Sequence, residues 1–417
     1  MPDGNPQIIQ NQDQELERPE PKHFTRFNCE PADRLTAEAV EAFRIEHGIR
    51  SGKGQTRALC GFLMTCKALE KRTEQTFTWP SSKTVLTNYE ANQRVRNTLM
   101  GLYFHQEGPT GCNWTKKATV YRLDVMPDTC GLRFQETNPR NLVEVRDFKS
   151  GQGGLFFYEP TGEILKEQTC LHEFGEQKFR GELQRMQDLN EYLSKNPLTL
   201  NGDIYRYLVR KFNNRSLSHG GRLYGGYSAQ EKCYRASATI AGEPIVQLDV
   251  KASFLFIRAA LGNVNLGEGS GDPYGQLPFV VDEHSRKFAK ALLSAMISSG
   301  GTKQNMPPKI RNKFPEIVTK STTMRTFQEP ILQIFPFLEK EVDGLHVMYR
   351  ESEAILKVLE LGMEWSIPAW PLHDCIFVRK RDLHIGVEMI KTGFEEEIGF
   401  RPTISVNPLD GSPEYDI

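Results

Sequence analysis

Two aspartates lie at the ends of apolar runs, where a charge needs a binding partner. Residues 244–248 predict a buried strand that ends at Asp249, and a second apolar run with helical spacing follows it. Burial of a carboxylate is costly unless a salt bridge, a helix N-terminus or a metal binds it. Asp249 is therefore the first candidate metal ligand.

The second carboxylate, Asp374, lies between two short strand-like runs at 367–372 and 375–378. This order predicts a hairpin whose turn displays His373 and Asp374. Two acidic residues at the tips of neighbouring strands suit a pair of Mg2+ ions, with Mn2+ as a possible substitute, because Mg2+ uses one or two protein carboxylates plus substrate phosphates. Two such ions can stabilise the attacking and leaving oxygens of a phosphoryl transfer.

A basic helix is predicted between these two segments, over residues 281–301. Arg286, Lys287 and Lys290 fall within about one turn, and Arg286 and Lys290 project from one face because they are four residues apart. Such a face could grip a triphosphate, and its lysine could give a proton to leaving pyrophosphate.

Each segment also has a plain structural interpretation. Asp249 could cap the helix that begins near Lys251. The hairpin could be an ordinary polar turn, and the basic helix face could simply be solvated.

Composition places the chain among globular proteins. It has 417 residues, 38% hydrophobic and 25% charged, with a formal net charge of −1, so any nucleic-acid surface must be a local patch. None of the eight cysteines forms a C-x2-C pair, which argues against a zinc ribbon and, with no recognisable signal peptide, favours the cytoplasm. No apolar run approaches 18 residues, so no membrane partner is expected.

The N-terminal third predicts a mobile tail and a small helical domain. Residues 1–34 lack apolar periodicity, and helices are expected at 36–48 and 55–72 within a domain that spans 35–125. Residues 81–125 have the order helix, turn, helix and two strands, which indicates a mainly α winged-helix-like domain that binds nucleic acid. The expected phosphate contacts are Arg94, Arg96, Lys116 and Lys117. A small structural domain with a solvated basic face remains the alternative.

The rest of the chain divides into three parts. Residues 126–160 are irregular and predict a linker. Residues 161–219 predict a helical, thumb-like region, with a polar helix at 175–196 and a second helix around 203–213. Residues 220–417 predict one α/β (α+β) unit.

This last unit resembles the palm and fingers of DNA polymerase I-type (family A) polymerases, which are related to single-subunit phage RNA polymerases. The resemblance covers roughly residues 220–410. Five blocks match in the same order: GRLYGGYSAQEKCYR (221–235), LDVKASFLFIRAA (248–260), GDPYGQL (271–277), RKFAKALLSAMISSG (286–300) and LHDCIFV (372–378). It implies a right-hand polymerase palm with reduced fingers and a helical thumb.

The resemblance also implies roles for individual residues. Asp249, Asp374 and the carbonyl of Val250 match the metal ligands. Arg286 and Lys290 match the pair that binds the triphosphate, with Lys290 as general acid. Nucleic-acid contacts would come from Arg222 and Gln230 in the first block and from His373 in the last.

Departures from the family pattern bear on nucleotide selection. Ser294 and Ser298 replace the Phe and Tyr expected four and eight residues beyond Lys290, so the surface that checks base and sugar is missing or rebuilt around Ser298. Phe254 replaces the Glu that blocks a ribose 2'-hydroxyl in the DNA enzymes, and its bulk favours deoxynucleotides. Cys375 replaces the acidic residue after the second aspartate.

These observations predict a compact template-dependent DNA polymerase of a phage, plasmid or other mobile element. Its expected partners are a DNA template and primer and nucleoside triphosphates; protein partners are not indicated. One alternative keeps the palm but makes RNA, as a primase or a small RNA polymerase. A third interpretation is a DNA-binding replication protein whose palm has lost its activity.

Overall fold

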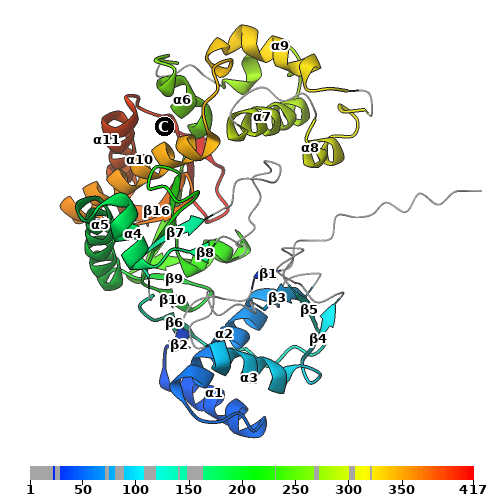
Figure 1. Cartoon of the computed structure of the whole chain (residues 1–417), viewed down its shortest axis with the longest axis vertical. Coiled ribbons are helices and arrows are strands. Elements are labelled where there is room, and N and C mark those ends of the chain that lie inside the picture. The colour runs from blue at the N-terminus through cyan, green and yellow to red at the C-terminus, as the bar shows by residue number, and fades with distance from the viewer. Residues whose placement is uncertain are drawn as a thin grey trace, which may run out of the picture.

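The computed structural model describes most of the chain. The described residues are 22–23, 29–70, 75–79, 89–107, 119–139, 141–147, 163–230, 232–266, 272–299, 306–319 and 322–417. Helices and mixed sheets alternate, so the predicted α/β class is confirmed. The chain forms three parts along its longest axis (Figure 1). From bottom to top these are an N-terminal domain, a central sheet with its helices, and an upper helical lobe. Within the described ranges, every helix is too short or too polar to span a bilayer.

The N-terminal domain packs three helices against a small sheet. The helices are α1 (Arg34–Glu46), α2 (Lys53–Leu69) and α3 (Tyr89–Leu99). The described strands follow the order β1-β3-β5-β4 and are β1 (Lys22–His23), β3 (Thr76–Thr78), β4 (Phe104–Glu107) and β5 (Val120–Leu123). Helix α2 is buried continuously from Ala58 to Leu69, because aromatic rings of the sheet pack on Phe62.

This domain contains two of the predicted elements. Helix α3 matches the longer helix expected near 90–102, and β4 and β5 form the expected antiparallel pair. The short helix predicted within 81–88, and Lys116 and Lys117 of the basic loop, lie outside the described residues.

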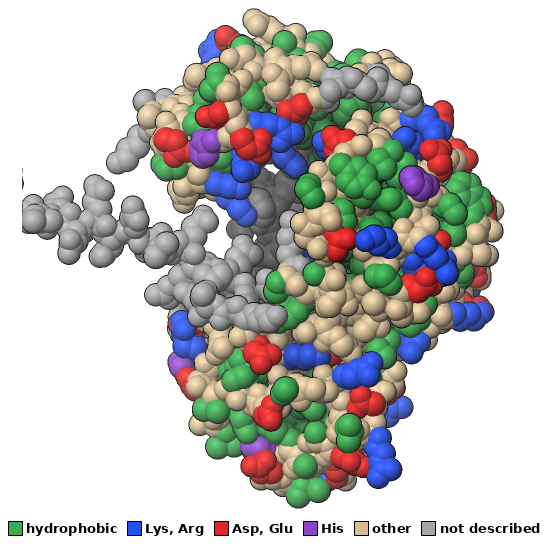
Figure 2. All heavy atoms as spheres, turned by 180° about the vertical axis from the view of Figure 1, so that it is seen from behind, with side chains coloured by type: hydrophobic (Ala, Val, Ile, Leu, Met, Phe, Trp, Pro, Cys, Tyr) green, Lys and Arg blue, Asp and Glu red, His purple; other side chains and the backbone are tan. Residues whose placement is uncertain are grey.

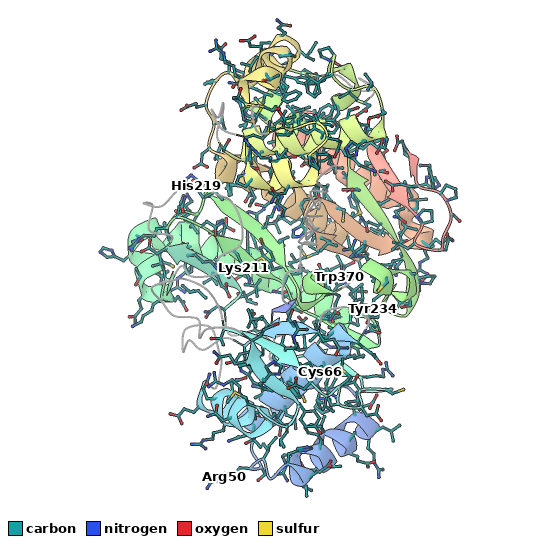
Figure 3. The ribbon with its side chains drawn as sticks, turned by 90° about the vertical axis from the view of Figure 1, so that its right-hand side faces the viewer. Arg50, Cys66, Lys211, His219, Tyr234 and Trp370 are labelled. Carbon is teal, nitrogen blue, oxygen red and sulfur yellow. The ribbon has the colours of Figure 1, made fainter. Side chains whose placement is uncertain are left out.

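A buried ion pair ties the N-terminal domain to the central sheet. The Lys67 ammonium on α2 donates to the Asp203 carboxylate at 2.8 Å and to the Leu132 carbonyl at 2.8 Å. The side chains of Lys67 and Asp203 are only 10% and 1% exposed. If the ion pair broke, each would be left as an unpaired charge in the protein interior, which is strongly destabilising. In a side view, Arg50 and Cys66 mark this lower domain, and Lys211, Tyr234 and Trp370 lie at the level of the central sheet (Figure 3).

The central sheet brings together segments from most of the chain. Among the described residues it has ten strands, of which eight follow the order β15-β16-β14-β13-β9-β10-β6-β2; β17 pairs with the C-terminal part of β14, and β18 pairs with β17. The strands are β2 (Cys29–Pro31), β6 (Phe134–Glu136), β9 (Leu198–Leu200), β10 (Asp203–Tyr205), β13 (Thr239–Ile240), β14 (Glu243–Val250), β15 (Ala369–Leu372), β16 (Cys375–Arg379), β17 (Ile404–Asn407) and β18 (Tyr415–Asp416).

A second sheet has the order β12-β11-β7-β8 within the described residues. Its strands are β7 (Val143–Asp147), β8 (Glu163–Ile164), β11 (Val209–Phe212) and β12 (Gly220–Tyr224). The helix predicted around 203–213 is therefore wrong, because these residues form β10 and β11. Besides pairing with neighbouring strands, β10 pairs with β6 and β11 pairs with β7, which are distant in sequence, and this pairing overrides the helical pattern.

The structure also differs from the linker expected at 126–160. Strand β6 joins the central sheet and β7 joins the second sheet. Burial alternates with a period of two within each strand, with Phe134 and Glu136 buried in β6 and Val143 and Val145 buried in β7, as is typical of half-buried strands. Turn-forming residues between these short strands made the segment look irregular.

The helices that accompany the central and second sheets are α4 (Glu167–Phe174), α5 (Glu176–Lys195), α6 (Ser253–Leu261), α10 (Gly344–Glu364) and α11 (Leu383–Ile398). Helix α11 packs on β14 and β16, and α10 packs on α11, β12 and β15. Helix α5 packs on α10 and β7, α4 packs on α5, and α6 packs on α10. Helices α10 and α11 lie in close contact, since a Cβ at Gly393 would be 2.7 Å from Val358 Cγ2. The upper lobe consists of α7 (Glu283–Ser298), α8 (Pro308–Lys313) and α9 (Arg325–Ile334).

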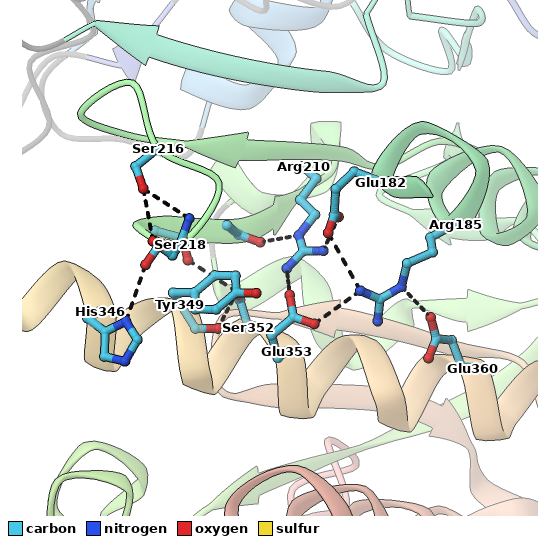
Figure 4. Close-up of polar contacts among 12 residues, drawn as sticks. Glu182, Arg185, Arg210, Ser216, Ser218, His346, Tyr349, Ser352, Glu353 and Glu360 are labelled. Carbon is cyan, nitrogen blue, oxygen red and sulfur yellow. Dashed lines mark hydrogen bonds and ion pairs between the residues drawn. The ribbon is translucent and has the colours of Figure 1, made fainter. Parts of the chain in front are cut away.

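A buried ionic cluster joins α5, β11 and α10 (Figure 4). The Arg210 guanidinium is fully buried; it contacts Glu182 and Glu353 and donates to the Gly221 carbonyl at 3.0 Å. Arg185 bridges Glu353 at 3.0 Å and Glu360 at 2.7 Å. The predicted polar helix at 175–196 thus exists as α5, and part of its polar surface packs on α10.

Candidate active site

Strand pairing brings Asp249 and Asp374 to one end of the central sheet. Strands β14 and β16 are antiparallel, with Asp249 opposite Cys375. The Val250 N–H donates to the Asp374 carbonyl at 3.3 Å, so the pairing continues into the hairpin turn. Two aspartates far apart in sequence therefore lie next to each other across adjacent strands.

Asp249 does not cap the following helix. Helix α6 begins at Ser253, and its N-cap is Ala252, which makes no side-chain capping bond. Ala252 has φ 51°, a left-handed conformation that is costly for a residue with a Cβ. The strand-to-helix turn thus leaves the Asp249 carboxylate available for another partner.

The hairpin predicted around Asp374 is confirmed. Strands β15 and β16 pair, and His373 and Asp374 form the turn between them. His373 has φ 61°, the left-handed conformation that a two-residue turn requires. Strand β15 is at the edge of the sheet, as Pro371 within it demands.

Burial lowers the pKa of His373 to about 4, and the positive charge of Arg222 acts in the same direction. The imidazole is therefore neutral near pH 7. Its Nδ1 is buried and has no hydrogen-bond partner among the described residues. A contact of the partly exposed ring with nucleic acid, the role that the sequence predicts for His373, stays a prediction.

The electrostatics of the pair favour binding of a cation. Burial and then the charge of Asp374 raise the pKa of Asp249 to about 7, while the positive charge of Lys290 lowers it. Two carboxylates held this closely repel each other, and a bound cation relieves both the repulsion and the cost of burial. Burial and the same two carboxylates also raise the pKa of Cys375.

The predicted basic helix is α7, and it presents Lys290 to this pair. The N-cap of the helix is Asp282, whose side chain accepts from the Ser285 N–H in a capping box. One face of α7 is buried through Phe288, which packs on Phe314 and Phe327. Lys290 is exposed, yet its charge acts on Asp249.

Arg286, one turn before Lys290, has a partner that the sequence did not reveal. Its guanidinium donates to both oxygens of Asp272, at 2.5 Å and 3.0 Å, and lies 5.6 Å from the centroid of the Tyr274 ring. Both charged side chains are partly exposed, at 32% and 37%. A triphosphate that binds Arg286 would therefore have to displace the Asp272 carboxylate from the guanidinium.

Ser298 is in the last turn of α7, two turns beyond Lys290. Its backbone carbonyl lies close to Gly344 at the start of α10, where an added Cβ would be 2.4 Å from that oxygen. Helix α7 thus ends directly against α10, and the contact at Ser298 that the structure shows is made by its backbone.

Arg222 and Phe254 lie together, and the charge of Arg222 also acts on His373, next to Asp374. The Arg222 guanidinium is 5.4 Å from the centroid of the Phe254 ring, on the first turn of α6. It also pairs with Glu351 on α10, whose side chain is 1% exposed. The sequence offered one signal for Glu351 that was not used: a Glu at an apolar position of a long amphipathic helix needs a buried partner.

The remaining predicted nucleic-acid contacts are dispersed. Gln230 donates to the Tyr205 hydroxyl at 2.8 Å, and its Oε1 is buried with no partner among the described residues. Arg94 lies 3.8 Å from Glu90 on α3, and Arg96 contacts the Tyr121 hydroxyl. Helix α3 is in the N-terminal domain, far from the upper lobe (Figure 1).

The donor atoms of the pair fit a magnesium ion. Asp249, Asp374 and the Val250 carbonyl supply only oxygen, as Mg2+ prefers. In the described part of the chain, no group of three or more His, Cys, Asp or Glu side chains could hold a metal. Two carboxylates suit a site at which substrate phosphates complete the coordination.

Seen from behind, the surface is hollowed below the upper lobe, and Lys and Arg side chains gather on the side of the lobe that faces the hollow (Figure 2). Such a basic concave surface attracts polyanions.

Comparison with known proteins gives limited similarity. No family model matches the chain, and no curated protein matches it. Among solved structures, the chain is similar to the POL domain of Pol1 from M. smegmatis in complex with DNA primer-template and dNTP, at 9% identity and a TM-score of 0.33. The match covers 60% of this chain and 57% of that chain, little more than half of the mycobacterial domain. Similarity at this level does not establish a family for the protein.

Proposed function

We propose that this protein is a template-dependent nucleotidyltransferase, a compact DNA polymerase of the family A type. The main support is the pairing of Asp249 and Asp374 across β14 and β16, with a pKa of about 7 at Asp249. Carboxylates whose pKa values are shifted by burial and by a specific charged neighbour are typical of functional sites, and a basic helix beside them suits a phosphate-bearing substrate.

In this proposal, Asp249, Asp374 and the Val250 carbonyl hold two Mg2+ ions. When bound, these ions lower the charge on the phosphates and stabilise the attacking and leaving oxygens. The protein's own contribution is to place two carboxylates at one end of the central sheet, where strand pairing fixes their separation.

The basic face of α7 binds the triphosphate and protonates the leaving group. Arg286 releases Asp272 and binds phosphate oxygens with the same two-pronged geometry. Lys290 is exposed and carries a proton that it can donate to the leaving pyrophosphate. The neutral His373 imidazole and Arg222 then contact the primer and template.

The choice of sugar rests on Phe254. Its ring is partly buried against the core and carries no polar atom that could hydrogen-bond a 2'-hydroxyl. This favours DNA synthesis. An RNA-making primase or small RNA polymerase would use the same aspartates, and an inactive DNA-binding protein would not need them.

Primer extension with separate pools of dNTPs and rNTPs tests the proposal. The wild type should extend a DNA primer with Mg2+ and dNTPs, and both Asp249→Asn and Asp374→Asn should lose activity. Asp410→Asn serves as the control, because Asp410 is exposed and its partners, Lys380 and Ser412, lie near it on the surface. Incorporation that survives loss of either aspartate would refute the two-carboxylate mechanism, and extension with rNTPs alone would indicate an RNA polymerase.

A further inference from the structure

Glu351 is a buried carboxylate whose two oxygens have different partners. Oε1 accepts from the Ser253 hydroxyl at 2.9 Å. Oε2 accepts from Arg222 Nε at 3.2 Å and from Nη2 at 2.5 Å. A side chain that is 1% exposed cannot exchange these partners for water, so the carboxylate holds both groups in place.

These two partners lie on either side of Phe254. Ser253 precedes it in the chain, so the bond to Glu351 fixes the backbone at the start of α6. The Arg222 guanidinium lies over the ring of Phe254, so the ion pair with Glu351 fixes the group that covers the ring. One carboxylate therefore restrains Phe254 through the residue that precedes it and through the guanidinium that lies over one face of its ring.

The start of α6 needs such a restraint. Ala252 has a left-handed backbone conformation and makes no side-chain cap, so the turn between β14 and α6 lacks the usual stabilisation of a helix N-terminus. The bond from Ser253 to Glu351 anchors the first helical residue instead. Without it, the side chain of Phe254 could move away from the aspartates.

We propose that Glu351 is a positioning residue that sets the selection of deoxyribose over ribose, by holding Phe254 where the sugar of the incoming nucleoside triphosphate binds. This inference rests on the proposed polymerase function. Glu351 does not touch the substrate; it acts through Ser253 and Arg222.

The test is the ratio of kcat/KM for a dNTP to that for the matching rNTP. Glu351→Gln keeps the size of the side chain but presents an amide N–H2 to one of two donors, and it should lower this ratio by about 10-fold, the usual effect of losing a hydrogen bond to a charged group. Phe254→Ala should lower the ratio at least as much. The double variant should match Phe254→Ala within about twofold, because both changes remove one interaction.

Two further variants separate positioning from folding. Ser253→Ala keeps the buried ion pair and should lower the ratio by about threefold; because it leaves Glu351 Oε1 without its hydroxyl donor, the melting temperature should also fall, although the protein stays folded. Glu360→Gln is the matched control, since Glu360 is also on α10 and also pairs with an arginine, at 2.7 Å. It should leave the sugar ratio unchanged.

A Glu351→Gln or Ser253→Ala enzyme that is slower but equally selective would overturn the inference, and so would additive losses in the double variant. A wild type that extends primers without preferring either sugar would also overturn it. A wild type that incorporates neither nucleotide would refute the proposed function itself, which distinguishes the two failures.

Discussion

Replacement of Asp249 by Asn should stabilise the metal-free protein at pH 8. The groups that act on the Asp249 carboxylate are Asp374, Glu414 and Glu351, which raise its pKa together with burial, and Lys290, which lowers it. The pKa rises from an ordinary value of 3.8 to about 7. Each pKa unit corresponds to about 1.4 kcal/mol, so ionised Asp249 lowers the free energy of unfolding by up to about 4 kcal/mol.

The pH dependence follows from the sign of this shift. Below about pH 4 the carboxyl is protonated in both the folded and the unfolded protein, and it costs nothing. As the pH rises from 4 to 7, the unfolded state releases its proton first, so the wild type loses stability until Asp249 is ionised in both states. Asn cannot ionise, so the advantage of Asp249→Asn should grow over this range and then level off.

Urea unfolding followed by circular dichroism, in EDTA and between pH 4 and pH 9, measures this difference. Asp410→Asn is the control: a salt bridge to Lys380 and bonds to Ser412 lower the pKa of Asp410, so its replacement should not stabilise the protein. Mg2+ should stabilise the wild type at pH 8 and act much less on Asp249→Asn. If the Asn variant were less stable than wild type at every pH, the two carboxylates would not repel each other and the reasoning would be refuted.

Two other predictions concern cationic residues. Lys290→Ala should reduce the rate of nucleotide incorporation by ~10²–10⁴-fold, with a smaller effect on nucleotide affinity. The control, Lys287→Ala on the same helix, should have little effect. If a rapid-quench experiment gave equal rates for Lys290→Ala and the wild type, Lys290 would have no part in the mechanism. Replacement of Arg94, Lys116 and Lys117 by Ala should weaken DNA binding and flatten its salt dependence, as measured by fluorescence anisotropy at several salt concentrations. An unchanged salt slope would assign the N-terminal domain to scaffolding.

The N-terminal domain shows how far local patterns determine structure. Helices α1, α2 and α3 were predicted to within a few residues, because apolar spacing and the glycine that follows α1 act within one helix. The burial of α2 on all sides was not predictable, since it depends on the sheet that packs around it and on the contact of Lys67 with Asp203.

Strands with distant partners were the main failure. The segment 203–213 has apolar residues that suit a helix as well as a strand, and only pairing of β11 with β7 and β12 decides between them. In contrast, β14 and the hairpin of β15 and β16 were predictable, because each apolar run ends at a polar residue or a turn.

For the candidate site, the sequence by itself determined which residue types are present and which local element carries each: Asp249 at the end of a strand, Asp374 in a hairpin turn, and Lys290 on a helix. The tertiary structure decided which of these side chains contact each other. It paired Arg286 with Asp272 and placed Glu351 under Arg222, because a buried or half-buried charge takes the nearest complementary group that packing provides. That group comes from another part of the chain, and no local periodicity specifies its position.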